Sequence, residues 1–73
     1  MDESVLKNIS ENIRFYRKSL GLTQEQLANM LVGKKSLVSN YENRHSLPDI
    51  ITLCKLADIF EISLDELVGR KFL

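Results

Sequence analysis

The first third of the chain shows apolar residues that recur with a helical period. Their spacings of 4, 3 and 4 residues place them on one face of an α-helix, which has 3.6 residues per turn. The four residues are Ile9, Ile13, Tyr16 and Leu20. This pattern predicts a helix over about 5–20 with these side chains in the core. Gly21 follows at once, where helices commonly end on a glycine in the left-handed conformation.

Two short helices separated by a tight turn are predicted next. Thr23 and Gln26 match the capping-box pattern, in which each side chain accepts a hydrogen bond from the other residue's backbone N–H. The first of the two helices therefore begins near Gln24, and Gly33 breaks it. The second runs from about Lys35 to Asn43. The apolar positions expected to hold both helices to the core are Leu27, Ala28, Leu31, Leu37, Val38 and Tyr41.

Two more helices complete the pattern. Asp49 follows the only proline and is placed to cap a fourth helix. The apolar stripe expected on that helix is Ile50, Leu53, Ala57 and Phe60. Cys54 lies beside the stripe and is expected to be a small core residue. Ser63 and Glu66 form a second capping box, so a short fifth helix follows through Leu64, Leu67 and Val68 and ends at Gly69. The sequence thus predicts an all-α fold of five helices.

Length and composition predict one domain over 1–73, with its core at about 9–69 and a tail at 70–73. No apolar run reaches the length of about 18 residues that crosses a bilayer. The first ten residues lack the basic and apolar regions of a signal peptide. One cysteine cannot form an internal disulfide, which fits a reducing compartment. We therefore expect a cytoplasmic protein with no membrane partner.

Charge is balanced overall but unevenly distributed. The net charge is zero, with ten basic and ten acidic side chains. Between residues 14 and 45 there are six Lys or Arg and two acids, whereas between 46 and 67 there are one base and five acids. This asymmetry fits either two ordinary solvated faces or one face turned toward a polyanion and one turned away. Charge alone does not decide between these interpretations.

The helix predicted at 35–43 carries the chemistry of most interest. A short helix that follows a tight turn at a steep angle projects from the core, and its size fits the roughly 12 Å width of the DNA major groove. Its outer polar residues, on the side opposite Val38 and Tyr41, are Lys35, Ser36, Ser39 and Asn40. Lysine can donate to guanine, and asparagine can pair with adenine through two hydrogen bonds. The alternative is an ordinary solvated helix face.

Three ordered segments resemble one known family. Gly21–Ala28 (GLTQEQLA) is similar to the opening of the helix-turn-helix in Cro/C1-type repressors, also called the XRE family. The resemblance continues through Val38–Asn43 (VSNYEN) and Pro48, and it ends with Ile62–Leu67 (ISLDEL). It spans about 9–69, which is nearly all of the chain. The resemblance implies a five-helix, lambda-repressor-like DNA-binding domain that inserts helix 35–43 into the major groove of an operator.

The resemblance also implies roles for individual residues. Gln24 would touch a phosphate or a base at the start of the second helix. Lys35, Ser36 and Asn40 would face base edges, and Leu37 would approach the groove near a thymine methyl. Residues implied to lie near the sugar-phosphate strand are Lys34, Asn43 and Arg44. Arg17 and Glu42 would form an ion pair that ties the first helix to the third, a structural role.

The chain departs from the family pattern at both ends of the third helix. The preceding turn reads Val32-Gly33, whereas the family usually has Gly-Val in that order. Lys34 stands where a serine or threonine normally caps the helix. Arg44 replaces the usual glycine, so either Asn43 takes the left-handed conformation or the turn differs. These departures leave the fold prediction unchanged and affect the expected angle of the helix.

Two functions remain as hypotheses. The favoured one is a transcriptional regulator, expected to be a repressor, that binds two-fold symmetric DNA as a homodimer with half-sites about 34–36 Å apart. The candidate dimer residues, with a frayed tail as the alternative for the last two, are Ile62, Leu64, Val68, Phe72 and Leu73. The second hypothesis is a protein-interaction module of the same fold, such as an antitoxin-like partner, which the zero net charge and the missing cap favour slightly.

Catalysis and metal binding find no support in the sequence. There is no set of nucleophile, base and acid and no glycine-rich phosphate loop. His45 is the single histidine, and zinc needs three or four ligands. We therefore expect no enzyme activity, no cofactor and no metal.

Overall fold

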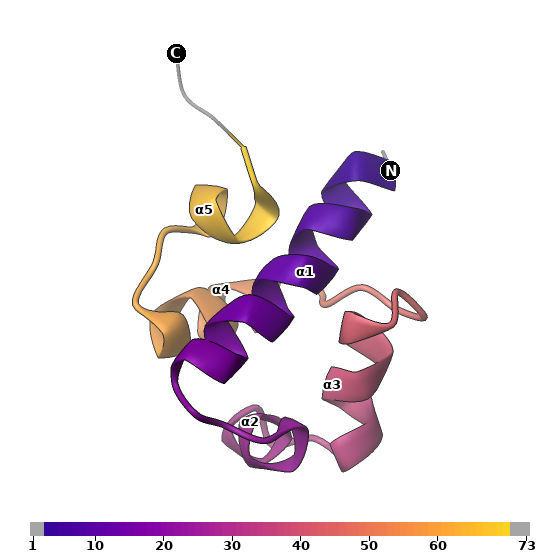
Figure 1. Ribbon diagram of the computed structural model, residues 1–73, viewed down its shortest axis with the longest axis vertical. Coiled ribbons are helices and arrows are strands. Elements are labelled where there is room, and N and C mark those ends of the chain that lie inside the picture. Colours follow the sequence, from indigo (N-terminus) through magenta and orange to yellow (C-terminus); the bar gives the residue numbers. More distant parts are fainter. Residues whose placement is uncertain (1–2, 71–73) are drawn as a thin grey trace.

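The computed structural model describes residues 3–70, and this part of the chain folds into five α-helices (Figure 1). Their bounds are α1 Glu3–Ser19, α2 Gln24–Met30, α3 Lys35–Glu42, α4 Ile50–Phe60 and α5 Leu64–Val68. No strand occurs within residues 3–70. All five predicted helices are present, and the observed ends lie within about two residues of the predicted ones, so the predicted all-α class is confirmed.

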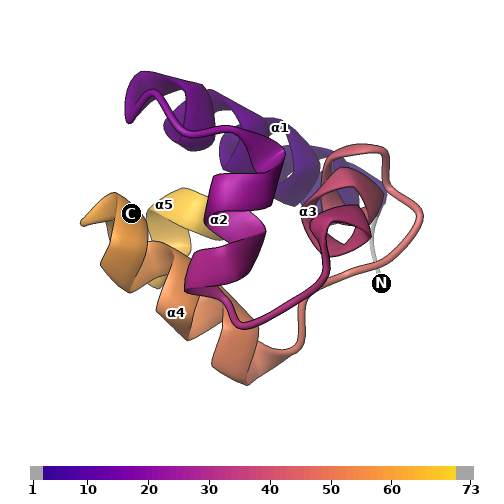
Figure 2. The ribbon, with the colours of Figure 1, turned by 90° about the horizontal axis from the view of Figure 1, so that it is seen from below.

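Helix α1 runs through the middle of the molecule and packs against α3 on one side and α5 on the other (Figure 1). Helices α2 and α3 cross at a steep angle. In Figure 1, α2 is seen nearly along its axis while α3 lies in the plane of the view; Figure 2 reverses this relation. Because α3 meets α2 and α1 through one side, its opposite side faces outward from the bundle.

One hydrophobic core joins all five helices. Ile13, Leu27, Val38, Leu56 and Leu67, one from each helix, are fully buried. The rest of the core consists of Ile9, Ala28, Leu31, Tyr41, Ala57 and Phe60. Full burial of a side chain of this size contributes roughly 1.5–3 kcal/mol to folding, so this single cluster is what holds the short helices together.

Side-chain caps start three of the helices where the sequence predicts them. Thr23 and Gln26 form a reciprocal capping box at α2, with Gln26 N donating to Thr23 Oγ1 at 3.0 Å. Thr52 N donates to Asp49 Oδ1 at 2.8 Å at the start of α4. Ser63 and Glu66 form a second capping box at α5. Gly21 takes the left-handed conformation after α1, as predicted, and Gly69 takes it after α5.

Two core predictions at the ends of helices are wrong. Leu20 is 50% exposed, because α1 ends at Ser19 and the helical spacing no longer aims Leu20 at the core. Ile50 is 61% exposed at the first residue of α4. The inner face of α4 is instead formed by Leu53, Leu56, Ala57 and Phe60, which are spaced i, i+3, i+4 and i+7. Both errors come from extending a regular stripe to the end of a helix: Leu20 follows the last residue of α1, and Ile50 is the first residue of α4.

The prediction that Cys54 is a core residue is also wrong. Cys54 is exposed because it lies outside the inner face of α4. The left-handed residue of the turn after α2 is Val32 (φ 56°), which is 90% exposed, and not Gly33. A side chain at Gly33 would collide with Leu37, so this glycine permits a close approach of the turn to α3. None of the described helices is long and apolar enough to span a membrane.

Candidate nucleic-acid interface

Helix α3 separates its apolar and polar sides as the sequence predicts. Val38 is fully buried and Tyr41 is 6% exposed, so the inner side anchors the helix. Lys35 and Ser36 are exposed at its start. Leu37, Ser39 and Asn40 are partly exposed, and the Asn43 side-chain amide donates to Ser39 Oγ at 3.3 Å. Helix α3 therefore presents a polar outer surface that the core leaves open.

The start of α3 is uncapped and positively charged. Lys34 is the N-cap residue, with extended backbone (φ −78°, ψ 155°) and no side-chain cap among the described residues. Lys34 and Lys35 are both exposed, and the first turn contains no acid. The N-terminal end of a helix carries partial positive charge. Two lysines add to that charge, so this end of α3 favours an anionic neighbour.

A shallow hollow joins the start of α2 to the start of α3. It is lined by Arg17, Thr23, Gln24, Glu25 and Lys35. It brings together Gln24 and Lys35, two predicted contact residues from different helices. The tight turn and the steep crossing of α2 and α3 place these residues side by side, although eleven positions separate them in the sequence.

Glu42, the last residue of α3, binds donors from two other helices. Its side chain is 0% exposed, and Arg17 donates to both of its oxygens, Nε to Oε2 at 2.6 Å and Nη2 to Oε1 at 3.1 Å. The structure thus contains the ion pair that the family resemblance implies. Gln24 Nε2 and Arg14 Nε also donate to Oε1, at 3.2 and 3.3 Å. One carboxylate therefore fixes the end of α3 against α1 and the start of α2.

The pKa of Glu42 reflects this arrangement. Burial alone would raise the pKa, because an ionised carboxylate loses solvation inside a protein. Hydrogen bonds from Arg17, Gln24 and Arg14, together with the charge of Arg17, outweigh burial and hold the pKa below its ordinary value. Glu42 is therefore ionised at neutral pH and keeps its donors in place.

Arg44 turns back toward α1. It adopts the left-handed conformation itself (φ 63°), while Asn43 keeps φ −93°, so Arg44 retains the backbone shape for which the family usually has glycine. Its Nε donates to Oγ of the buried Ser10 at 3.2 Å, and its Nη2 lies 3.5 Å from Glu11 Oε2. Its predicted position near a sugar-phosphate strand stays a prediction, but its guanidinium already has partners on α1.

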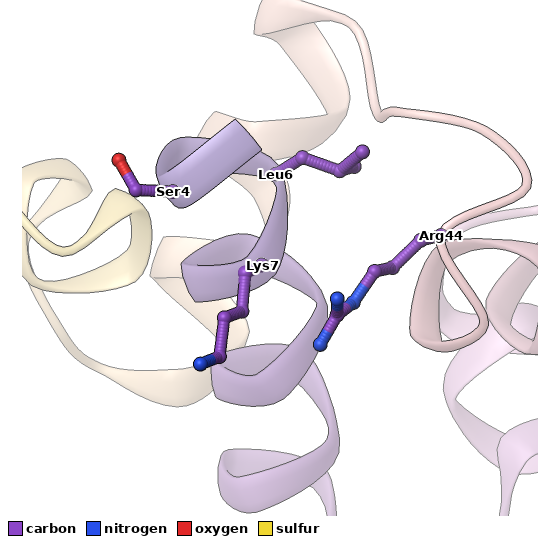
Figure 3. Close-up of a pocket in the computed structure, with 4 residues that line it drawn as sticks. All are labelled: Ser4, Leu6, Lys7 and Arg44. Carbon is purple, nitrogen blue, oxygen red and sulfur yellow. The ribbon is translucent and has the colours of Figure 1, made fainter. Parts of the chain in front are cut away.

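The same arginine lines a second hollow, at the beginning of α1 (Figure 3). Ser4, Leu6 and Lys7 from α1 form the rest of its lining. In Figure 3 the Arg44 side chain reaches from the turn after α3 toward α1. The side chains of Lys7 and Arg44 therefore place two positive charges at this hollow. Arg44 follows the C-terminal end of α3, whereas Lys35 lies at the N-terminal end.

Sequence reasoning missed Arg14 and Ser10. Both lie on α1, outside the segments that resemble the family most closely. A signal for Arg14 was present, because residues three apart share a helix face and Arg14 precedes Arg17 by three. Ser10 gave no signal, since a buried serine that accepts from Arg44 depends on how α3 packs on α1.

The candidate dimer residues divide into two groups. Ile62, Leu64 and Val68 are partly buried and pack against the core, so each offers only part of its surface to a partner. Phe72 and Leu73 lie outside the described residues. Within residues 3–70, no group of three His, Cys, Asp or Glu side chains is placed to hold a metal ion.

Comparisons with known proteins agree with this geometry. The model of a helix-turn-helix family matches residues 13–67. The chain is 39% identical over 62 residues to the cryptic phage CTXphi transcriptional repressor RstR of Vibrio cholerae, covering 85% of this chain and 55% of that protein. It is 34% identical over 64 residues to the regulator ImmR of Bacillus subtilis, covering 86% of this chain and 50% of ImmR.

A third relative, the regulator AnsR of Bacillus subtilis, is 34% identical over 55 residues, which cover 75% of this chain and 47% of AnsR. The chain thus spans about half the length of the curated relatives that it matches. No solved structure is significantly similar. The matched residues include α2, α3 and the turn between them. The chain therefore belongs to the Cro/C1-type helix-turn-helix family.

Proposed function

We propose that this domain binds double-stranded DNA in a sequence-specific manner and regulates transcription, as its relatives' names say of them, with repression as the expected effect. Helix α3 enters the major groove. Lys35, Ser36 and Asn40 meet base edges, and Leu37 and Ser39 border them. Gln24, Lys34, Asn43 and Arg44 lie along the sugar-phosphate strands, and Arg44 does so after its guanidinium leaves Ser10 and Glu11. A regulator of this kind acts on DNA in the cytoplasm.

One observation carries the proposal: the polar side of α3 is open while its apolar side is buried. Lys35 and Ser36 are exposed next to the exposed Lys34, and Val38 and Tyr41 hold the helix from beneath. A helix of this kind can approach base edges without losing its own packing. Contacts with phosphates position such a protein, and contacts with base edges give it sequence preference.

A single α3 reads few base pairs, so we infer that two copies bind together on a two-fold symmetric operator. Two half-sites about 34–36 Å apart would place both copies of α3 on one side of the duplex. The exposed parts of Ile62, Leu64 and Val68, together with Phe72 and Leu73, remain the proposed contact between copies. Selection of bound duplexes from a random pool tests this spacing directly, because the selected sites should be two-fold symmetric.

DNA binding itself is tested by fluorescence anisotropy with labelled mixed-sequence duplexes at low and moderate salt. Affinity should fall steeply as salt rises, because phosphate contacts release counterions. On a selected duplex, Lys35→Ala and Asn40→Ala should relax base preference, while Lys55→Ala on α4 should change nothing. If both α3 variants bind like the unchanged protein, the assignment of α3 is wrong. No binding at any salt would favour a protein-interaction module instead.

A further inference from the structure

The ion-pair cluster around Glu42 contains more positive than negative charge. Two guanidinium groups, from Arg14 and Arg17, share one carboxylate. Arg17 is fully engaged: Nε and Nη2 donate to Glu42, Nη1 donates to the Leu22 carbonyl at 2.8 Å, and its side chain is only 11% exposed. Its charge is therefore matched by that of Glu42, and the charge of Arg14 is in excess.

Arg14 is held loosely by comparison. A single nitrogen, Nε, donates to Glu42 Oε1 at 3.3 Å, and the side chain is 49% exposed. Within residues 3–70, neither of its two terminal amino groups donates a hydrogen bond to another residue. Arginine presents five donors in a planar fork that suits the oxygens of a phosphate. Half of the Arg14 side chain is exposed, and a single nitrogen of the fork has a partner within residues 3–70.

Arg14 lies beside a predicted DNA contact. Arg14 Nε and Gln24 Nε2 donate to the same atom, Glu42 Oε1, at 3.3 and 3.2 Å. The polar ends of the two side chains therefore lie next to each other, although they come from α1 and α2. Gln24 and Lys35 also line the same hollow at the start of α2. A phosphate that reaches Gln24 would find Arg14 beside it.

We propose that Arg14 binds a DNA backbone phosphate together with Gln24, while Glu42 orients both side chains. The inference rests on the proposed function, since it assumes that α3 lies in the groove. It adds a contact on α1 that neither the sequence motifs nor the family resemblance assigns. Arg17 uses all three of its nitrogens on Glu42 and Leu22, and Arg44 is bound through two nitrogens to Ser10 and Glu11. Arg14 uses Nε alone, so among these three arginines it keeps the most donors for another ligand.

The test is the slope of log K against log salt, measured by anisotropy with a labelled mixed-sequence duplex. Each phosphate contact contributes about 0.9 to the magnitude of this slope. Arg14→Gln should lower the magnitude by about 0.9 for each bound copy, on every sequence tested. Arg14→Lys, which keeps the charge, should retain most of the slope. Lys55→Gln on α4 removes the same charge elsewhere and should leave the slope unchanged.

Circular dichroism melts of each variant verify that the fold is intact before binding is compared. A lower affinity of Arg14→Gln with an unchanged slope would make Arg14 a support for Glu42 alone and overturn the inference. A slope for Arg14→Lys as low as that for Arg14→Gln would also overturn it. These outcomes leave the proposed function standing. If the unchanged protein fails to bind DNA, the proposed function fails first and the inference with it.

Discussion

Two short helices of this domain, α5 and α3, are built in opposite ways at their ends. Helix α5 starts with a reciprocal capping box between Ser63 and Glu66, has two acids in its first turn and ends at Gly69 in the left-handed conformation. Helix α3 starts at Lys34 without a side-chain cap. It has no acid in its first turn, and the left-handed residue that follows it is Arg44.

The difference indicates what each helix depends on. Caps and first-turn acids each stabilise a helix, typically by about 1 kcal/mol and 0.3–1 kcal/mol, and α5 has both. Helix α3 has neither, so it depends on Val38, Tyr41 and the ion pair of Glu42. Departures from local stability rules are expected where a protein functions. The uncapped, basic start of α3 is disfavoured in isolation and becomes favourable next to an anion.

The largest difference between α3 and α5 should appear when one stabilising glutamate is removed from each helix. Glu42→Ala removes the carboxylate that balances the buried charge of Arg17, which should destabilise the fold by about 3–5 kcal/mol. Glu66→Ala removes half of a capping box at α5 and should cost only about 1 kcal/mol. Urea denaturation followed by circular dichroism measures both. If Glu42→Ala does not fold, Glu42→Gln, which keeps the shape, replaces it. Equal losses would contradict the proposed dependence of α3 on tertiary contacts.

Low pH should weaken the attachment of α3 to α1 and α2, because Glu42 becomes protonated. The pKa of Glu42 in the folded protein lies below its ordinary value of about 4.3, despite burial, because Arg17 and Gln24 donate to the ionised form. Its contribution to stability is therefore complete above about pH 4.3 and is lost as pH falls through the folded pKa. The stability gap between the unchanged protein and Glu42→Gln should narrow with acid in urea titrations from neutral to low pH. A constant gap would contradict this linkage.

Adding an N-cap to α3 and removing the N-cap of α5 should change the stability of the fold in opposite directions. Lys34→Ser supplies the cap that α3 lacks and should stabilise the fold by about 1 kcal/mol, while Ser63→Ala should destabilise it by about 1 kcal/mol. Thermal melts measure both changes. We also expect Lys34→Ser to weaken binding to mixed-sequence DNA, because it removes a cation from the uncapped end. A variant that gains stability and keeps full affinity would mean that Lys34 does not contribute to DNA binding.

The sequence predicted the helices well because their signals are local. Thr23 with Gln26, and Ser63 with Glu66, determine helix starts through contacts within four residues, so no knowledge of packing was needed. The predictions for Leu20, Ile50 and Cys54 failed because their burial depends on which residues of a helix meet the core. Arg14 escaped notice for a similar reason: its proximity to Gln24 arises only when α1, α2 and α3 meet at Glu42. The outer residues of α3 followed from periodicity, whereas the path of the Arg44 side chain did not.

The smallest predicted effect concerns the other end of α3. Arg44 and Glu61 are both left-handed, at φ 63° and 56°, a conformation that is unfavourable for residues with a Cβ by roughly 1–2 kcal/mol. Glu61→Gly should therefore raise stability, by about 1 kcal/mol after the added chain entropy of glycine is subtracted. Arg44→Gly relieves the same strain but loses the hydrogen bond to buried Ser10, which contributes about 0.5–1.5 kcal/mol. Its net change in thermal melts should lie near zero. Equal gains for the two variants would mean that the contact with Ser10 contributes nothing to folding. In that case no energy would be lost when the Arg44 side chain leaves Ser10 to contact a DNA phosphate.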